Sequence, residues 1–201
     1  MSDDQLFDGE GRRLYLTAEE RTAFLAVARQ ARREVRTLCE TLHYTGCRLS
    51  EALALTPRRI DLSGNTVTFE TLKKRRKGVF RAVPVPADYL DTLQMGHGIR
   101  QVQKRAQAPE LDQRLWPWHR SHAWRLVKAV MAEAGIDAGQ PHATPKGLRH
   151  AYGIAAINAQ VPLNMLCKWM GHASIETTAI YANAIGAEQQ AINARMWETP
   201  I

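Results

Sequence analysis

One stretch of this chain, residues 61–86, alternates apolar and polar side chains as β-strands do, and it lies between long regions of helical periodicity. Val67 and Phe69 alternate with polar neighbours, and a second apolar set follows a basic segment, namely Val79, Ala82, Val83 and Val85. The pattern predicts a strand, a turn centred on Lys77 and Gly78, and a second strand. We therefore expect a mainly α-helical fold with a small antiparallel β-hairpin or sheet.

Apolar residues recur at helical spacing in the rest of the chain. Thr17 followed by Glu20 is the signature of a capping box, so the first helix is expected to begin after Thr17. Further helices are predicted over residues 34–44, 49–55, 88–96, 98–106, 121–134, 145–158, 162–169, 174–183 and 187–197. Residues 1–13 are expected to form a flexible acidic lead, and residues 14–201 a single domain.

The composition narrows the class of protein. The chain has 201 residues, 45% of them hydrophobic and 23% charged, as globular proteins do. No apolar run approaches the ~20 residues of a membrane span, so no membrane partner is expected. Cys39, Cys47 and Cys167 are widely spaced, which argues against a disulfide framework and favours a reducing compartment, the cytoplasm. The net charge of +7 favours nucleic acid as the partner.

The densest positive charge falls in the predicted hairpin. It consists of Lys73, Lys74, Arg75, Arg76 and Lys77, followed by Arg81. Such a cluster is either a solvated loop or a surface that holds an anion, and a hairpin of this width is narrow enough to enter a DNA groove.

Two helix starts carry further cationic side chains. In the segment TGCRLSEAL, residues 45–53, Arg48 either pairs with Glu51 on the next turn or grips an anion. In the segment KGLRH, residues 146–150, Lys146, Arg149 and His150 lie in the first turns of a helix. Backbone N–H groups at a helix N-terminus already favour an anion, so this end is a candidate phosphate site.

A fourth segment, MGHASIETTAIY, spans residues 170–181. His172 lies in the junction between two predicted helices, and Tyr181 follows nine residues later. A lone His or Tyr is more often structural than catalytic, so the signal is the combination of the four segments.

In combination, these segments resemble the tyrosine recombinase (phage integrase) family, in their order and spacing and over residues 15–197. The resemblance implies the catalytic-domain fold of that family for residues 14–201. The usual member also has an N-terminal core-binding domain, for which the chain has no room before about Leu14. Either the chain is a truncated piece or it is a short natural form.

The resemblance also implies a site-specific recombinase that breaks and rejoins DNA strands through a 3′-phosphotyrosyl intermediate. Tyr181 would be the nucleophile, activated by its surroundings because a free phenol has a pKa of about 10. Arg48 and Arg149 would hold the non-bridging phosphate oxygens, and His172 would donate a hydrogen bond to the same phosphate.

The remaining roles are divided between hairpin and helix. Lys73 would be the general acid that protonates the leaving 5′-oxygen, although Lys74 and Arg76 lie in the same loop, and a one-residue slip changes the face of a strand residue. The other hairpin cations, Lys74, Arg75, Arg76, Lys77 and Arg81, would contact DNA. Glu51 would orient Arg48, and His150 would support the site.

One position departs from the family pattern. The second motif usually begins with His, and here it begins with Lys146. A charged lysine can only donate a proton, so its role as a base toward Tyr181 would need a strongly lowered pKa. We expect Lys146 to act mainly through its charge.

No metal or other cofactor is expected, because no metal-ligand spacing and no P-loop is present. Expected partners are double-stranded DNA and further copies of the chain, as a tetramer on DNA and a monomer when free. Ile185, Ile192, Met196 and Trp197 form an apolar stripe that either docks on its own core or passes to a neighbour.

Two other functions remain open: a non-cleaving DNA-binding module and a type IB topoisomerase. Integration, excision, resolution and inversion are equally compatible with the motifs, and the natural setting is a mobile element in a bacterial cytoplasm or nucleoid.

Overall fold

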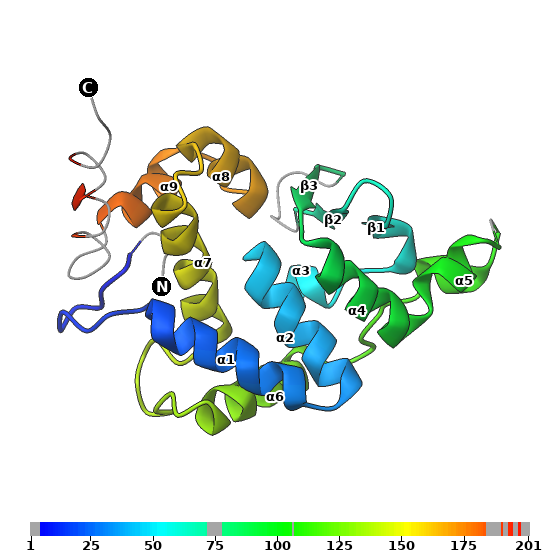
Figure 1. Ribbon diagram of the computed structural model, residues 1–201, viewed down its shortest axis with the longest axis horizontal. Coiled ribbons are helices and arrows are strands. Elements are labelled where there is room, and N and C mark those ends of the chain that lie inside the picture. Colours follow the sequence, from blue (N-terminus) through cyan, green and yellow to red (C-terminus); the bar gives the residue numbers. More distant parts are fainter. Residues whose placement is uncertain are drawn as a thin grey trace.

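A computed structural model describes residues 5–71, 78–105 and 107–183, together with residues 190, 193, 194 and 197. Figure 1 shows α2 running through the middle of the molecule, with α7 and α8 on one side and the small sheet with α4 on the other. The helices are α1 (Ala18–Gln30), α2 (Arg33–Thr45), α3 (Leu49–Ala52), α4 (Ala87–His97), α5 (Ile99–Gln103), α6 (Arg120–Glu133), α7 (Pro145–Asn158), α8 (Leu163–Met170) and α9 (Glu176–Ala179). Short 3-10 turns are η1 (Pro57–Arg59), η2 (Pro109–Asp112) and η3 (Ile180–Asn183).

Helix α2 is the centre of the core. It contacts α1, α3, α4, α6 and α7, so it is covered on nearly every side. The residues predicted to face inward, Val35, Leu38, Cys39 and Leu42, are all buried. The helix ends at Gly46, which adopts a left-handed φ of 58°. A Cβ there would lie 2.3 Å from the ring of Tyr152 on α7, so only glycine allows this approach.

Most of the predicted helices are confirmed, and the ends differ where caps decide them. The capping box of α1 is present, with the Thr17 hydroxyl accepting from the Glu20 N–H and the Glu20 carboxylate accepting from the Thr17 N–H. The third helix is shorter than predicted and ends at Ala52. The helix predicted over 174–183 is divided into α9 and η3. Of the helix predicted over 187–197, nearly all lies outside the described residues.

The predicted hairpin is confirmed as two strands of a three-stranded antiparallel sheet, β1 (Ile60–Asp61), β2 (Thr66–Glu70) and β3 (Phe80–Pro84). The first strand has two residues, too few to show alternation, and was therefore not predicted. Strands β2 and β3 pair with Val67 opposite Val83 and Phe69 opposite Arg81, and all four side chains are buried. Residues 72–77, which hold Lys73, Lys74, Arg75, Arg76 and Lys77, lie outside the described residues.

The N-terminal segment differs from the prediction of a flexible acidic lead. Residues 5–13 turn back through a bridge between Phe7 and Arg13, and the Asp8 carboxylate accepts from the Arg12 side chain at 2.8 Å. Leu6 is only 4% exposed and packs in a small apolar cluster with Tyr15, Tyr181 and residues of α7 and α8. The prediction rested on the acidic side chains of this segment and did not recognise Leu6 as a buried apolar contact.

At the other end, Trp197 is 76% exposed, so this side chain of the predicted apolar stripe does not dock on its own core. Ile185, Ile192 and Met196 lie outside the described residues. Within the described part of the chain, no helix has the length and apolar character to cross a membrane.

Candidate active site

The site is built where the end of α2, the starts of α3 and α7, and the segment after α8 meet. Arg149 lies in the second turn of α7 and is buried. Its guanidinium donates to the backbone carbonyls of Gly46 at 2.6 Å and Met170 at 2.8 Å, which fixes it between two chain segments. Burial, and then the charge of Arg48, lower the pKa of Arg149, but a guanidinium remains charged at ordinary pH.

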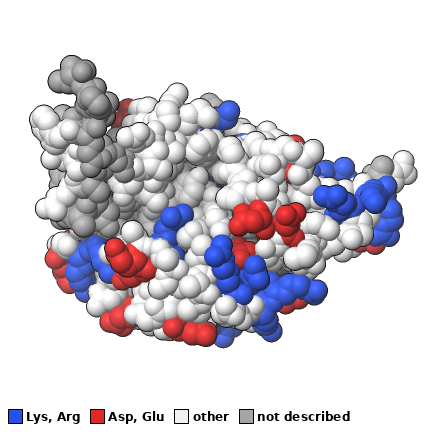
Figure 2. Space-filling view, viewed as in Figure 1, with Lys and Arg blue, Asp and Glu red and all other residues white. Residues whose placement is uncertain are grey.

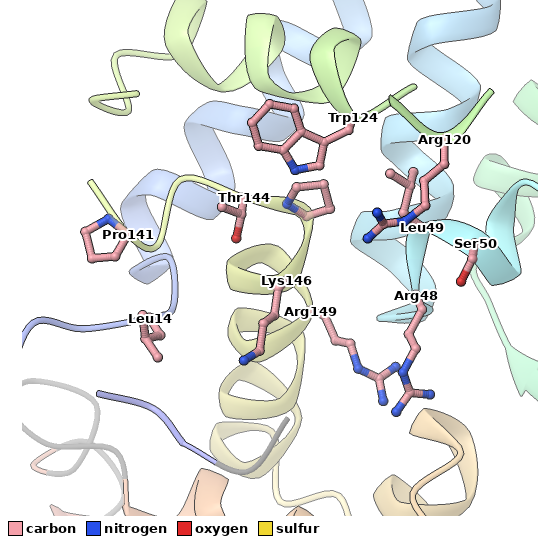
Figure 3. Close-up of a pocket in the computed structure, with 11 residues that line it drawn as sticks. Leu14, Arg48, Leu49, Ser50, Arg120, Trp124, Pro141, Thr144, Lys146 and Arg149 are labelled. Atoms are coloured by element: carbon pink, nitrogen blue, oxygen red, sulfur yellow. The ribbon is translucent and has the colours of Figure 1, made fainter. Parts of the chain in front are cut away.

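Arg48 lies just before α3, and its side chain is 25% exposed. Its backbone N–H donates to the Glu51 carboxylate at 2.9 Å, and its guanidinium donates to the same carboxylate at 3.2 Å. Figure 3 shows the guanidinium groups of Arg48 and Arg149 converging from different elements. The two readings of Arg48 are therefore compatible, because Glu51 orients a guanidinium that remains partly open to solvent.

Arg81 was predicted to contact DNA, and the structure corrects this. It is only 6% exposed, since the alternation of β3 turns it to the same side as Val83. It donates to Glu51 at 2.6 Å and to the Trp169 carbonyl at 2.8 Å. Burial alone raises the pKa of Glu51, but the charge and hydrogen bonds of Arg81, followed by those of Arg48, outweigh it and hold that pKa below its ordinary value. Arg81 thus ties the sheet to α3 and to the end of α8.

Tyr181, in η3, is fully buried against α7. Its hydroxyl lies 3.3 Å from Nδ1 of His150, and a Cβ on Gly153 would come within 2.6 Å of its ring. The absence of a side chain at Gly153 therefore creates the flat surface on which the phenol lies. Tyr181 and Arg149 also interact electrostatically, so the phenol lies within electrostatic range of that arginine.

His172 lies between α8 and α9, in the junction predicted for it. Its Nδ1 is hydrogen-bonded to the Thr178 hydroxyl at 2.8 Å, and its ring stacks on Tyr181 at 6.1 Å between centroids. The turn depends on Gly171, which ends α8 with a φ of 66°. His172 and Tyr181 thus reach the site from opposite ends of one short connection.

A pocket of about 380 Å³ adjoins the arginine pair. Lys146, Arg120 and Trp124 help to line it together with Arg48 and Arg149. Figure 3 shows Lys146 leaving α7 on the side away from the converging guanidinium groups. Arg120 and Trp124, at the start of α6, were not predicted, because nothing in the sequence relates that helix to the other motifs.

The structure thus brings together six predicted site residues, Arg48, Glu51, Arg149, His150, His172 and Tyr181. Lys146 borders the same pocket, and Lys73 lies outside the described residues. The sequence reasoning did not identify Gly46, Gly153 and Thr178 as residues of the site. The two glycines are revealed by the close approaches of tyrosine rings, and Thr178 by its hydrogen bond to His172. Figure 2 shows the Lys and Arg side chains of one face in separate groups with acidic groups between them, rather than in one continuous band.

Two cations beside a phenol and two imidazoles form a site that can bind a phosphate-like anion and attack it with the phenol oxygen. The guanidinium groups match the non-bridging oxygens, and the phenol needs a neighbouring proton acceptor to become a nucleophile. Within the described residues, no group of three or more His, Cys, Asp or Glu side chains is placed to hold a metal ion.

Residues 14–187 match the model of the phage integrase family. The tyrosine recombinase XerD of Mycobacterium tuberculosis is 30% identical over 151 residues, which cover 73% of this chain and 46% of XerD. The catalytic domain of bacteriophage HP1 integrase superposes with a TM-score of 0.62 at 21% identity, covering 93% of this chain and 98% of that one. The XerH recombinase bound to its difH substrate superposes with a TM-score of 0.71 at 20% identity, covering 96% of this chain and 56% of that one.

Proposed function

The chain belongs to the phage integrase family of tyrosine recombinases, and from that premise we propose that it is a site-specific recombinase acting on double-stranded DNA. It spans 46% of the length of the XerD that it matches, so the activity of a whole recombinase is part of the proposal. The observation that carries it is the convergence of Arg48 and Arg149, shown in Figure 3, together with a buried Tyr181 that interacts electrostatically with Arg149 and lies 3.3 Å from the next residue of α7, His150. A module that only bound DNA would need none of this arrangement.

In the proposed reaction, the Tyr181 oxygen attacks a backbone phosphate and displaces the 5′-oxygen of the next nucleotide. The new bond is a 3′-phosphotyrosyl linkage, and the broken P–O bond leaves a 5′-hydroxyl once that oxygen takes a proton. The attack of a 5′-hydroxyl from a second strand reverses these steps and rejoins DNA. Because each phosphodiester is exchanged for another ester, no external energy source is required.

The residues divide this work. Arg48 and Arg149 neutralise the charge that grows on the non-bridging oxygens, and losing one such donor is expected to cost about 10²-fold in rate. His172, steadied by Thr178, donates to the same phosphate. Lys73 protonates the leaving oxygen, and Lys74, Arg75, Arg76 and Lys77 contact the DNA backbone. Lys146 contributes charge at the pocket wall.

The setting of the reaction belongs to the same proposal. Residues 14–201 act as the catalytic domain, and copies of the chain assemble as a tetramer on two duplexes and separate to monomers without DNA. The net charge of +7 supports a DNA partner. The three free cysteines support a reducing compartment, the cytoplasm.

A nicked suicide substrate with randomised sequence tests the proposal, because the protein itself then selects its target site. A pool of such duplexes, each with a nick near the centre, is incubated with the protein, and adducts that survive SDS are recovered and sequenced. The wild type is expected to form adducts on a narrow set of sequences and Tyr181→Phe none. Tyr152→Phe, which keeps the nucleophile, is the matched control and should form them. Failure of the wild type on every sequence, or adducts with Tyr181→Phe, would overturn the proposal.

A further inference from the structure

We propose that His150 is the general base that takes the phenolic proton of Tyr181, an assignment that rests on the proposed recombinase function. The family pattern has an imidazole at the position of Lys146. A His directly after the second arginine, as His150 is here, is also frequent in the family, and in this chain it is this imidazole, one turn further along the same helix, that lies within reach of the nucleophile. His150 is thereby a catalytic residue rather than a supporting one, because it touches the reacting oxygen.

The geometry is defined from three sides of the phenol. Nδ1 of His150 lies 3.3 Å from the Tyr181 hydroxyl, and both residues are almost completely buried, at 1% and 0% exposure. The Tyr181 ring packs against the backbone at Gly153, and the ring of His172 stacks on the Tyr181 ring. A contact of 3.3 Å is long for a strong hydrogen bond, but contacts to a nucleophile often tighten only when substrate binds.

Lys146 is poorly suited to the same task. Its ammonium group can only donate hydrogen bonds, whereas neutral imidazole has an acceptor nitrogen at ordinary pH. Figure 3 shows its side chain leaving α7 on the side away from Arg48 and Arg149, the two residues proposed to hold the scissile phosphate. Lys146 and His150 are four residues apart and share a side of the helix, and His150 places its acceptor nitrogen against the phenol.

The step balances without any co-reactant. The O–H bond of Tyr181 breaks as Nδ1 of His150 gains the proton, and the freed electron pair forms the new bond to phosphorus. The P–O bond to the 5′-oxygen breaks, and that oxygen takes its proton from the general acid. For this, the ring proton of neutral His150 must lie on Nε2, which leaves Nδ1 as the acceptor. In the rejoining step His150 returns the proton to the tyrosine oxygen.

Several charged groups face the His150–Tyr181 pair. Arg149 of α7 interacts electrostatically with Tyr181 and with Arg48 from the segment before α3, and His172 from the segment after α8 stacks on the phenol. Lys146 of α7 lines the adjoining pocket. Tyr15 of the N-terminal segment and Tyr152 of α7 pack in the cluster around the phenol. The arginines stay charged throughout the range of a pH titration, so His172 is the neighbouring imidazole that needs a control.

The test uses the duplexes recovered as adducts, with a 5′-bridging phosphorothiolate at the cleaved position. A thiolate leaves without help from a general acid, so the rate of adduct formation reports the base. His150→Asn is the informative variant, because its carboxamide oxygen occupies nearly the place of Nδ1. It accepts the hydrogen bond of the phenol and does not accept its proton.

We expect the wild-type rate to fall about tenfold per pH unit on the acid side of the profile. In His150→Asn the rate should fall at least 10²-fold at pH 7, and the acid limb should disappear. Lys146→Met and His172→Asn should both retain the limb. DNA binding and thermal unfolding, measured for each variant, separate a lost base from a lost fold.

The outcomes distinguish the two levels of the proposal. If the wild type forms adducts and His150→Asn forms them with the same rate and pH profile, His150 is not the base and the recombinase function stands. Loss of the acid limb in Lys146→Met instead would transfer the role to Lys146. If the wild type forms no adduct on any duplex, the recombinase function and this inference fail together.

Discussion

At the scale of single residues, Glu51 is the most consequential side chain outside the reacting groups. One buried carboxylate accepts from Arg48, which faces the pocket, and from Arg81, which anchors the sheet. Removing one partner of a buried ion pair costs about 3–5 kcal/mol because the other charge remains buried. We predict that Glu51→Gln lowers the free energy of unfolding by about 3 kcal/mol at pH 7 and lowers the rate of adduct formation.

The pH dependence of this loss has a defined sign. The arginines hold the pKa of Glu51 below its ordinary value, so its stabilisation is present above about pH 4.3 and is lost as pH falls through the folded-state pKa. The gap between wild type and Glu51→Gln should therefore narrow in urea denaturation below about pH 4. Glu133→Gln, on an exposed position of α6, is the matched control and should show no gap. A gap that stays constant down to about pH 3 would contradict the assigned ion pairs.

At the scale of elements, α7 carries the site because it presents Arg149, His150 and the bare backbone of Gly153 on consecutive turns. We predict that Gly153→Ala displaces the Tyr181 ring, since the added methyl would lie 2.6 Å from it. Adduct formation should fall at least tenfold, while DNA binding changes little. Overpacking of this kind costs about 1–3 kcal/mol, against up to ~1 kcal/mol that alanine gains in a helix.

A double-mutant cycle attributes that effect to the ring. In a Tyr181→Ala background the clash is absent, so Gly153→Ala should there stabilise the protein in thermal unfolding. Equal destabilisation in both backgrounds would place the clash elsewhere on α7.

Elements with their own local signals were predictable from the sequence. The 145–158 helix was predicted with its observed ends, because Thr144 caps it, Pro145 fits its first turn, and apolar periodicity defines its length. Arg81 was misplaced because the basic run before it suggested one continuous charged surface, whereas strand alternation turns this residue inward. The anchoring of Leu6 depends on a tertiary contact with α7 and α8, for which a local pattern gives no signal.

At the scale of the whole molecule, the buried His43 and the partly buried His97 couple the fold to pH. Burial, then Arg21 and Arg29, lower the pKa of His43 to about 3, and burial, then Arg33, lower that of His97 to about 4. The unfolded chain takes up these protons near pH 6.5 and the folded chain does not. We therefore predict that stability falls from about pH 6.5 toward 4.5, by up to ~1.4 kcal/mol per pH unit for each histidine.

Urea denaturation at several values between about pH 7 and 4.5 measures the effect. His43→Gln and His97→Gln should each reduce the dependence of the free energy of unfolding on pH, whatever stability each substitution loses at neutral pH. His119→Asn, which keeps a capping side chain at the exposed start of α6, is the control and should leave it unchanged. Glu40, whose pKa burial raises, acts in the opposite direction, so the comparison is made between variants. An unchanged slope in both the His43 and the His97 variant would show that the folded protein takes up these protons over the same pH range as the unfolded chain.

The charge of the whole molecule also governs how the proposed recombinase would hold DNA. With a net charge of +7, phosphate contacts are expected to be the main source of that affinity, and each contact adds about −0.9 to the slope of log affinity against log salt. We predict that binding of Tyr181→Phe to a recovered duplex weakens steeply between about 50 and 200 mM salt, by about 10³-fold if six phosphates are engaged.

Adding Arg75→Gln and Arg76→Gln to that variant should make the slope shallower by about 1.8, one contact for each hairpin arginine. The matched pair Arg32→Gln and Arg33→Gln removes the same charge at the opposite end of α2 from Arg48 and should leave the slope nearly unchanged. Equal changes in both pairs would mean that net charge, rather than the hairpin, holds the duplex.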